Sequence, residues 1–322
     1  MNEWVIRPYR QTDAAAWRAF LHASNNATLF HDLDFLGYHP PGKYDFRHLI
    51  ALCGTQFEAV IPGALSADGI FVSLAGASIG GPAVRKSMPA ESCLRLVEAL
   101  QLYCKSEGWQ GIEITLPPPV YHDEPDQMIE FALHVRGFQL VHRSMPLLIP
   151  LDREKSNHYE RIFRERQRRY VRACRQKGVA VTESGIDGLS GFLELLEETH
   201  VRLKAQPTHT HAEIQDLFHR VPSHLRVWSA HLDGIVIASM LLFILNRNIC
   251  NTFYLCDRAS HRANHGATVL LAEVIDALGE RGYRYLDMGP SASTVHFNQG
   301  VVGFKESLGA RAFSRDRWRW QN

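Results

Sequence analysis

The chain repeats one pattern of residues at a spacing of 174. Residues 89–115 hold an amphipathic helical pattern that ends at Gly108 and leads into a strand-like segment. Residues 266–289 repeat this plan with the glycine at Gly282, and 282 − 108 = 174. A glycine at each helix end permits the left-handed conformation that stops a helix. Because each copy must build the same unit, the repeat predicts a duplicated fold.

Runs of alternating apolar and polar residues precede both predicted helices. Antiparallel strands followed by a helix and further strands give an α+β fold, in which helices flank a mixed, mostly antiparallel sheet. A length of 322 residues exceeds what one core usually serves, so we predict two tandem domains, residues 1–150 and residues 151–322. The predicted strands cover residues 57–65, 69–74, 225–232, 235–245 and 250–255, and the two copies end in terminal strands over 139–149 and 311–320.

Composition excludes several classes of partner. Lysine and arginine number 35 against 34 acidic residues, so a net charge of +1 argues against general binding to DNA or to a membrane surface. The longest apolar run, residues 235–245, is too short to cross a bilayer. The N-terminus shows no secretion signal, and the six cysteines form no Cys-x-x-Cys pair. We expect a cytoplasmic protein with reduced thiols and no membrane insertion.

A basic segment follows the predicted domain joint at residues 150–152. Residues 159–177 are predicted to form one long helix, whose apolar positions share a stripe that packs while the arginines face outward. The outward face is either a solvated surface or a clamp for phosphate, because arginine binds phosphate through two parallel hydrogen bonds. The cations are Arg161, Arg164, Arg166, Arg168, Arg169, Arg172, Arg175 and Lys177.

The order of predicted elements resembles the GNAT acyltransferase fold, and the tandem arrangement resembles its FemAB/FemX-like branch. Three segments carry the resemblance: residues 166–178, the Tyr254-x-x-Asp257 strand end, and Gly303-Phe304-Lys305-x-x-x-Gly309. The resemblance implies transfer of an acyl or aminoacyl group to an amine. It implies acetyl-CoA or another acyl-CoA as donor in the broad fold, and aminoacyl-tRNA in the enzymes of peptidoglycan bridges. It places the acceptor side in the first domain and the reaction and donor site in the second.

The loop before the second repeated helix is the predicted donor site. In the GNAT fold, such a loop has the pattern Arg/Gln-x-x-Gly-x-Gly/Ala and holds the pyrophosphate of coenzyme A on its backbone N–H groups. Here His265 stands at the first glycine position of that pattern, and Gly266 is displaced by one. A helix N-terminus and an arginine still attract an anion. The alternative is an ordinary loop in which Asn264 caps the helix. The predicted donor-binding residues are Arg262, Asn264, His265, Gly266 and Ala267.

Four residues are candidates for the chemistry. Lys305 lies beside the reacting groups in the FemX-like pattern, where its ammonium would hold a phosphate or stabilise the oxyanion of a tetrahedral intermediate. His296 or Asp287 would receive the proton from the amine, and Tyr254 would protonate the leaving thiolate or ribose hydroxyl. The alternatives are an exposed lysine, an exposed histidine, an aspartate bonded to its own turn, and a core tyrosine.

Substrate contacts are expected from both halves. His31 and Tyr38 lie in a segment that resembles the acceptor side of FemX-like proteins, and Phe304 either lines the site or belongs to the core. Arg166 and Arg169 would bind the phosphates of a nucleotide-linked acceptor or of tRNA. The histidines of residues 208–211 lack a third ligand, so no metal site is expected.

These observations favour an N-acyltransferase that acts by direct attack without a metal. The acceptor would be an amine on a small molecule or a nucleotide sugar, such as a precursor of the cell envelope. Two alternatives stay open: an aminoacyl-tRNA-dependent ligase of the FemX type, and a degenerate GNAT pair that only binds.

Overall fold

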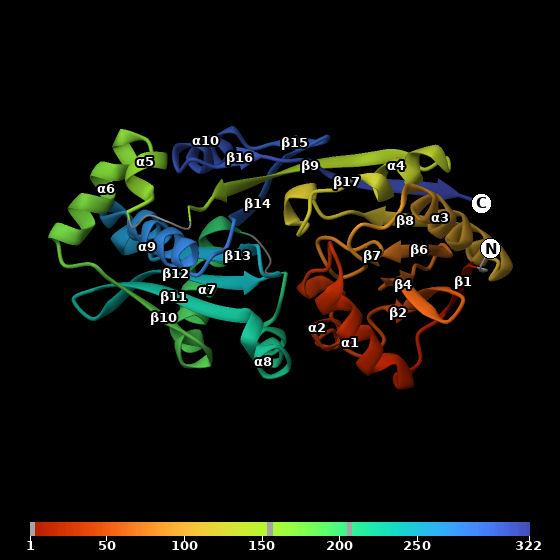
Figure 1. Ribbon diagram of the computed structural model, residues 1–322. Helices are drawn as coiled ribbons and strands as arrows, with labels where there is room; N and C mark the ends of the chain where they lie inside the picture. The colour runs from red at the N-terminus through yellow and green to blue at the C-terminus, as the bar shows by residue number, and fades with distance from the viewer. Residues whose placement is uncertain (1–3, 153–156, 205–207) are drawn as a thin grey trace. The chain divides into compact units, whose positions relative to one another are not determined.

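A computed structural model describes residues 4–152, 157–204 and 208–322. The chain divides into two compact units: unit 1 comprises residues 1–144 and 314–322, and unit 2 comprises residues 145–313. This division differs from the predicted joint at residues 150–152 in two ways: the boundary follows Ser144, and residues 314–322 belong to unit 1. Figure 1 labels the elements. No helix in the described ranges has both the length and the apolar character that a bilayer span needs.

Unit 1 contains two groups of paired strands. One is a sheet in the order β1-β3-β4-β7; the other contains β17-β8-β6-β5-β2, with the first part of β9 beside β17. The strands are β1 (Trp4–Pro8), β2 (Asp45–Phe46), β3 (Leu49–Cys53), β4 (Gln56–Ile61), β5 (Ala64–Leu65), β6 (Ile70–Ser73), β7 (Ala83–Val84), β8 (Gly111–Thr115), β9 (Gln139–Pro150, shared with unit 2) and β17 (Arg315–Gln321). The helices are α1 (Ala14–Ala23), α2 (Leu33–Leu36), α3 (Ala90–Ser106) and α4 (Met128–Val135), with 3-10 turns η1 (Gln11–Asp13), η2 (Leu29–His31) and η3 (Pro119–Tyr121).

Unit 2 is built on strands in the order β10-β11-β12-β13-β14, with the second part of β9 beside β14 and β16. The strands are β10 (Ala180–Ser184), β11 (Leu225–Leu232), β12 (Ile235–Ile244), β13 (Ile249–Asp257), β14 (Tyr285–Ser293), β15 (His296–Phe297) and β16 (Arg311–Ala312). The helices are α5 (Tyr159–Ile162), α6 (Glu165–Gln176), α7 (Leu189–Leu203), α8 (His211–Arg220), α9 (Gly266–Glu280) and α10 (Gln299–Ser307), with 3-10 turns η4 (Ile186–Gly188), η5 (Pro222–His224) and η6 (Ala259–Asn264).

The repeat is visible in the strand pairing. In unit 1, β8 follows α3 and pairs in parallel with β6, starting at Gly111 opposite Ile70. In unit 2, β14 follows α9 and pairs in parallel with β13, starting at Tyr285 opposite Ile249. The two starting residues are 285 − 111 = 174 apart, which is the spacing seen in the sequence. The prediction of a duplicated α+β unit is therefore confirmed.

Each repeated helix covers a sheet face through its apolar stripe. The buried stripe of α3 includes Leu96, Val97 and Leu100, and it joins the core of unit 1. The whole inner face of α9 is buried, and this helix packs on β11 and β12. The apolar residues whose periodicity predicted these two helices are thus the residues that are buried.

Three predicted elements are interrupted. The strand predicted over 57–65 is two strands of different sheets, β4 and β5, which Pro62 and Gly63 separate. The basic helix over 159–177 is two helices, because Phe163 turns into the core and Arg164 takes an extended conformation. The Arg164 N–H then donates to Ser307 O over 2.8 Å. The last strand, predicted over 311–320, is split into β16 and β17, and β17 pairs with β8 in unit 1.

Candidate functional site

A cavity of about 480 Å³ lies in unit 2 between α6, the start of α9, and α10. Figure 1 shows α6 beside α9. We call it the α6–α9–α10 cavity. Its lining consists of Arg164, Arg166, Gln167, Tyr170, His265, Thr268, Gly300, Gly303, Phe304 and Ser307.

Hydrogen bonds tie the three walls together. The Gln167 side chain of α6 donates to Ser307 Oγ of α10 over 2.9 Å, and Thr268 Oγ1 of α9 donates to Gln167 Oε1 over 3.4 Å. Ser307 Oγ in turn donates to Phe304 O over 2.6 Å. Because polar side chains from each element bond to the next, the cavity has a fixed framework before any ligand enters.

His265 connects α6 to the start of α9. It precedes the first residue of α9 in a left-handed conformation, with φ of +49°. Its ring stacks on the Tyr170 ring, with 3.5 Å between ring centroids, and Arg166 Nε donates to Tyr170 Oη over 2.6 Å. Burial, and then the charges of Arg166 and Lys177, lower the pKa of His265. The ring is therefore held neutral at pH 7.

The lining is cationic. It contains two arginines and no carboxylate, and among the described residues neither Arg164 nor Arg166 forms an ion pair. The N-terminus of α9 adds the positive end of a helix dipole at His265. Uncompensated guanidinium groups beside a helix N-terminus suit an anion, and phosphate above all.

Glycines of the site serve two different purposes. A Cβ atom on Gly303 would meet no atom within 4 Å, so this position leaves open space beside Phe304. A Cβ atom on Gly266 would approach the Ile237 side chain to 3.0 Å and the Ala238 Cβ to 3.2 Å. Gly266 therefore allows α9 to pack closely on β12, rather than giving a ligand access to the backbone.

The predicted donor loop is only partly directed at the cavity. His265 lines it, and Gly266 and Ala267 follow in the first turn of α9. Arg262 is instead 62% exposed and paired with Asp257 over 2.9 Å, and Asn264 Oδ1 accepts from Lys177 Nζ over 2.9 Å. Asn264 does not cap α9, since His265 occupies that position.

Lys305 lies in the helix α10. The residue is 7% exposed, and its ammonium donates to Met288 O over 2.5 Å, Gly289 O over 2.8 Å and Ser291 Oγ over 2.8 Å. Burial lowers the pKa of Lys305 to about 8, although the negative charge of Asp287 acts to raise it. Three acceptors match the three N–H bonds of an ammonium, so in this structure Lys305 holds β14 to α10. A contact with a reaction intermediate stays a prediction.

Asp287 is also engaged within the protein. It is buried on β14, where its carboxylate accepts from Asn251 Nδ2 over 3.1 Å and from the Gly289 N–H over 2.7 Å. Gly289 has φ of +72°, a conformation that favours glycine. Asp287 therefore accepts from the N–H of Gly289 while Lys305 donates to its carbonyl oxygen, and both side chains hold the bend of β14 at this residue.

Tyr254 and His296 lie outside the cavity lining. Tyr254 Oη is 3.1 Å from Nδ1 of the buried His209, and burial raises the pKa of Tyr254. His296 is exposed on β15, two residues before Asn298, which caps α10 through its side chain. The α10 residues from Gly300 onward line the cavity.

The predicted substrate contacts separate into three groups. Arg166 and Phe304 line the cavity, whereas Arg169 is 70% exposed on α6, with its nearest carboxylate, that of Glu165, at 3.8 Å. In unit 1, His31 is fully buried and Tyr38 packs in an aromatic cluster with Phe35. The buried rings of His31 and Tyr38 offer little surface to an acceptor, because both belong to the core of unit 1.

Sequence reasoning did not select Gln167, Tyr170, Thr268, Ser307 or Gly300. Arg164 appeared only as one cation of the basic segment. The spacing of Arg166 and Tyr170, one helical turn apart, was a signal that they share a helix face. Nothing in the sequence indicated that Gln167 of the same helix bonds to Ser307, 140 residues later.

Comparisons with known proteins agree with this architecture. Residues 161–303 match a family model described as an acetyltransferase (GNAT) domain. The structure resembles that of FemX, at 12% identity and a TM-score of 0.77, over 98% of this chain and 97% of that one. It resembles L-PGS from Bacillus licheniformis, at 14% identity and a TM-score of 0.63, over 98% and 93%.

A third similar structure is a tandem GNAT protein from the clavulanic acid biosynthesis pathway. The identity is 12% and the TM-score 0.54, over 100% of this chain and 98% of that one. A search of curated proteins by sequence found no match. Likeness at such identities shows the fold, and it does not transfer a substrate. The chain therefore has the tandem GNAT fold, and residues 161–303 of its second unit match the acetyltransferase (GNAT) domain model.

Proposed function

We propose that the protein is an N-acyltransferase that binds acetyl-CoA, or another acyl-CoA, in the α6–α9–α10 cavity. The observation that carries this proposal is the cationic lining at the start of α9, with Arg164 and Arg166 free of ion pairs among the described residues. Coenzyme A presents phosphates, which such a lining binds. The open space at Gly303 gives room for the rest of the donor. When bound, the donor supplies a thioester carbonyl for an amine to attack.

His296 is the residue that we propose to receive the proton from the amine. Its ring is exposed on β15, and α10 begins three residues later. A histidine ring can accept a proton near neutral pH, whereas the carboxylate of Asp287 is already bonded on both sides. Tyr254 remains our candidate for protonating the leaving group, because a phenol carries its proton at neutral pH.

Lys305 and Asp287 have positioning roles in this proposal. They fix the bend at Gly289 through hydrogen bonds from opposite directions. The acceptor that we propose is an amine on a small molecule or a nucleotide sugar. That choice rests on the resemblance to FemX-like proteins and not on a contact in the structure.

Arg166→Gln should weaken the binding of acetyl-CoA about 10- to 100-fold, because a hydrogen bond to a charged group contributes roughly 1.5–3 kcal/mol. Isothermal titration calorimetry of the full chain measures this change. Arg169→Gln is the matched control on the same helix, since Arg169 lies outside the cavity lining. Equal losses in both variants, or no binding to the wild type, would contradict the proposed donor site.

An aminoacyl-tRNA donor is the second candidate. It is favoured by one observation: Arg262 pairs with Asp257 and Gly266 packs on β12, so the loop lacks the open glycine expected for coenzyme A. Binding of the single-stranded acceptor end of tRNA should weaken steeply with salt. The logarithm of the association constant should fall with the logarithm of the salt concentration, with a slope of about −0.7 for each neutralised phosphate. Measuring the affinity for tRNA and for acetyl-CoA at two salt concentrations separates the candidates.

A further inference from the structure

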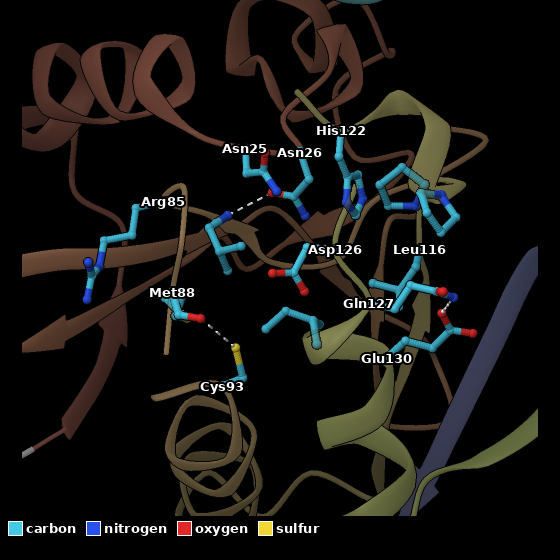
Figure 2. A pocket seen from close by; sticks show the side chains of 14 residues that line it. Asn25, Asn26, Arg85, Met88, Cys93, Leu116, His122, Asp126, Gln127 and Glu130 are labelled. Carbon is cyan, nitrogen blue, oxygen red and sulfur yellow. Dashed lines mark hydrogen bonds between the residues drawn. The ribbon is translucent and has the colours of Figure 1, made fainter. Parts of the chain in front are cut away.

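Unit 1 contains a second cavity, at the start of α4 (Figure 2). It measures about 30 Å³, which is room for about two water molecules. We call it the α4 cavity. Residues that line it include Met88, Cys93, Leu116, His122, Asp126 and Ile129.

The α4 cavity occupies the repeat-equivalent place of the α6–α9–α10 cavity. Three of its lining residues, Asp126, Ile129 and Glu130, lie 174 positions before Gly300, Gly303 and Phe304, since 300 − 126, 303 − 129 and 304 − 130 all equal 174. Residues at the start of the repeated helix, α3 or α9, line each cavity as well. The duplication therefore places a cavity beside corresponding helices of the two units, of about 30 Å³ in unit 1 and about 480 Å³ in unit 2.

The charge of the two cavities is opposite. Arg85 is the one arginine in the α4 lining; its side chain points away from the cavity, and its Nε bonds to Glu58 Oε2 over 2.6 Å (Figure 2). Burial lowers the pKa of His122 to about 4, although Asp126 opposes this, so the ring is neutral at pH 7. Asp126 and Glu130 are then left as the charged groups of the lining. An anion is disfavoured here, and a cation is favoured.

The carboxylate of Asp126 can accept further hydrogen bonds on the side of the cavity. Its Oδ1 accepts the Met128 N–H over 2.6 Å, and among the described residues its carboxylate forms no ion pair. In Figure 2 this carboxylate lies in the middle of the lining side chains, between the His122 ring and the Cys93 thiol. Within the same described set, His122 Nδ1 is buried and has no hydrogen-bond partner. A ligand with several N–H donors would satisfy both groups.

The remaining walls are rigid and largely apolar. Asn26 bonds to Pro82 O over 3.0 Å and to the Val84 N–H over 2.9 Å, so its amide is not available to a ligand. Met88, Cys93 and Leu116 supply apolar surface. Among the described residues, no group of three or more metal-ligating side chains is placed to hold a metal ion. The lining suits a short apolar arm that ends in a cation.

We propose that the α4 cavity binds the ammonium group of a primary amine carried on one or two carbon atoms. The ammonium would donate to the free carboxylate oxygen of Asp126 and to Nδ1 of the neutral His122. The arm would contact Met88, Leu116 and Ile129. This site is independent of the proposed donor site, and no bond to the amine is made or broken there.

Ethylammonium is the probe that matches this size. The ceiling on binding energy per non-hydrogen atom limits a ligand of three such atoms to a dissociation constant of about 0.5 mM or weaker. We expect saturable shifts of the His122 ring signal in NMR titrations of the full chain, at constant ionic strength and millimolar probe. The signal is assigned by its loss in His122→Gln. Ethanol, of equal size and no charge, should give no saturable shift.

Asp126→Asn should weaken this binding at least tenfold. Asparagine keeps an oxygen that can accept the Met128 N–H, so the variant removes the charge and not the local bond. Glu91→Gln, on an exposed residue of α3, is the matched control and should bind like the wild type. Three results would each overturn the proposal: no saturable shift in the wild type, equal affinity in Asp126→Asn, or equal binding of ethanol. The ethanol comparison needs no variant and stands even if Asp126→Asn unfolds.

Discussion

Between pH 6.5 and pH 4, unit 1 should lose stability because its buried His31 must stay neutral. Burial lowers the pKa of His31 to about 4, and a histidine in the unfolded chain titrates near 6.5. The unfolded state therefore binds more protons within this window. The stability is complete above pH 6.5 and is lost as the pH falls toward 4, by about 3 kcal/mol for this one residue. Burial also lowers the pKa of His48 and His122 to about 4, which acts in the same direction.

Urea unfolding followed by tryptophan fluorescence measures this loss. Of the six tryptophans, only Trp228 belongs to unit 2, so the signal reports mainly on unit 1. His31→Asn is the informative variant, because its amide oxygen can accept from Thr28 as His31 Nδ1 does, without titrating. Between pH 5 and 6.5, where most carboxylates no longer titrate, the free energy of unfolding should change more steeply with pH in the wild type than in this variant. His22→Asn, at an exposed position, should retain the wild-type dependence. Equal slopes in His31→Asn and the wild type would show that His31 is not held neutral.

Local features of the fold could be predicted from the sequence. The helical periodicity before Gly108 and Gly282 marks the buried stripes of α3 and α9, and both helices end within two residues of those glycines. Periodicity reports which side of an element is buried, so helices with a clear stripe were found. The spacing of 174 then carried over to the parallel strand pairs, because repeated sequences fold alike.

Partners distant in sequence could not be predicted. Alternation over 311–320 indicates a strand, but it does not say that β17 joins β8 of unit 1 rather than unit 2. The same holds for Phe163, whose burial in the core breaks the basic helix. Pairing and core contacts depend on the whole topology, and a short pattern does not contain it.

The candidate site shows the same division. Arg166, His265 and Phe304 were selected from motifs and line the cavity, because a motif preserves the residue types that a site needs. Arg262 belonged to a motif as well, yet it bonds to Asp257. Ser307 stands at an unspecified position of the segment 303–309, and its role follows only from its bonds to Gln167 and Arg164. A motif predicts the chemistry of a side chain better than it predicts its direction.

Lys305→Ala should lower the free energy of unfolding by about 1–3 kcal/mol. It leaves the buried Met288 O and the partly buried Gly289 O and Ser291 Oγ without their common donor. A buried group left unpaired costs roughly 1–3 kcal/mol, and the removed cost of burying the ammonium offsets part of the loss. Chemical unfolding monitored by circular dichroism measures the loss. Lys177 makes one exposed hydrogen bond, to Asn264, so Lys177→Ala should change the free energy of unfolding by less than about 0.5 kcal/mol.

The same variant distinguishes a positioning lysine from one that stabilises an oxyanion. A lysine that only contacts the intermediate would lower turnover and leave stability unchanged, and that result would refute the positioning role. A pH series adds a second criterion. Burial lowers the pKa of Lys305 to about 8, against about 10.4 in an unfolded chain, so the unfolded state binds more protons between these values. Relative to Lys305→Met, the wild type should therefore gain stability as the pH rises from 8 to 10, because the cost of burying the ammonium disappears.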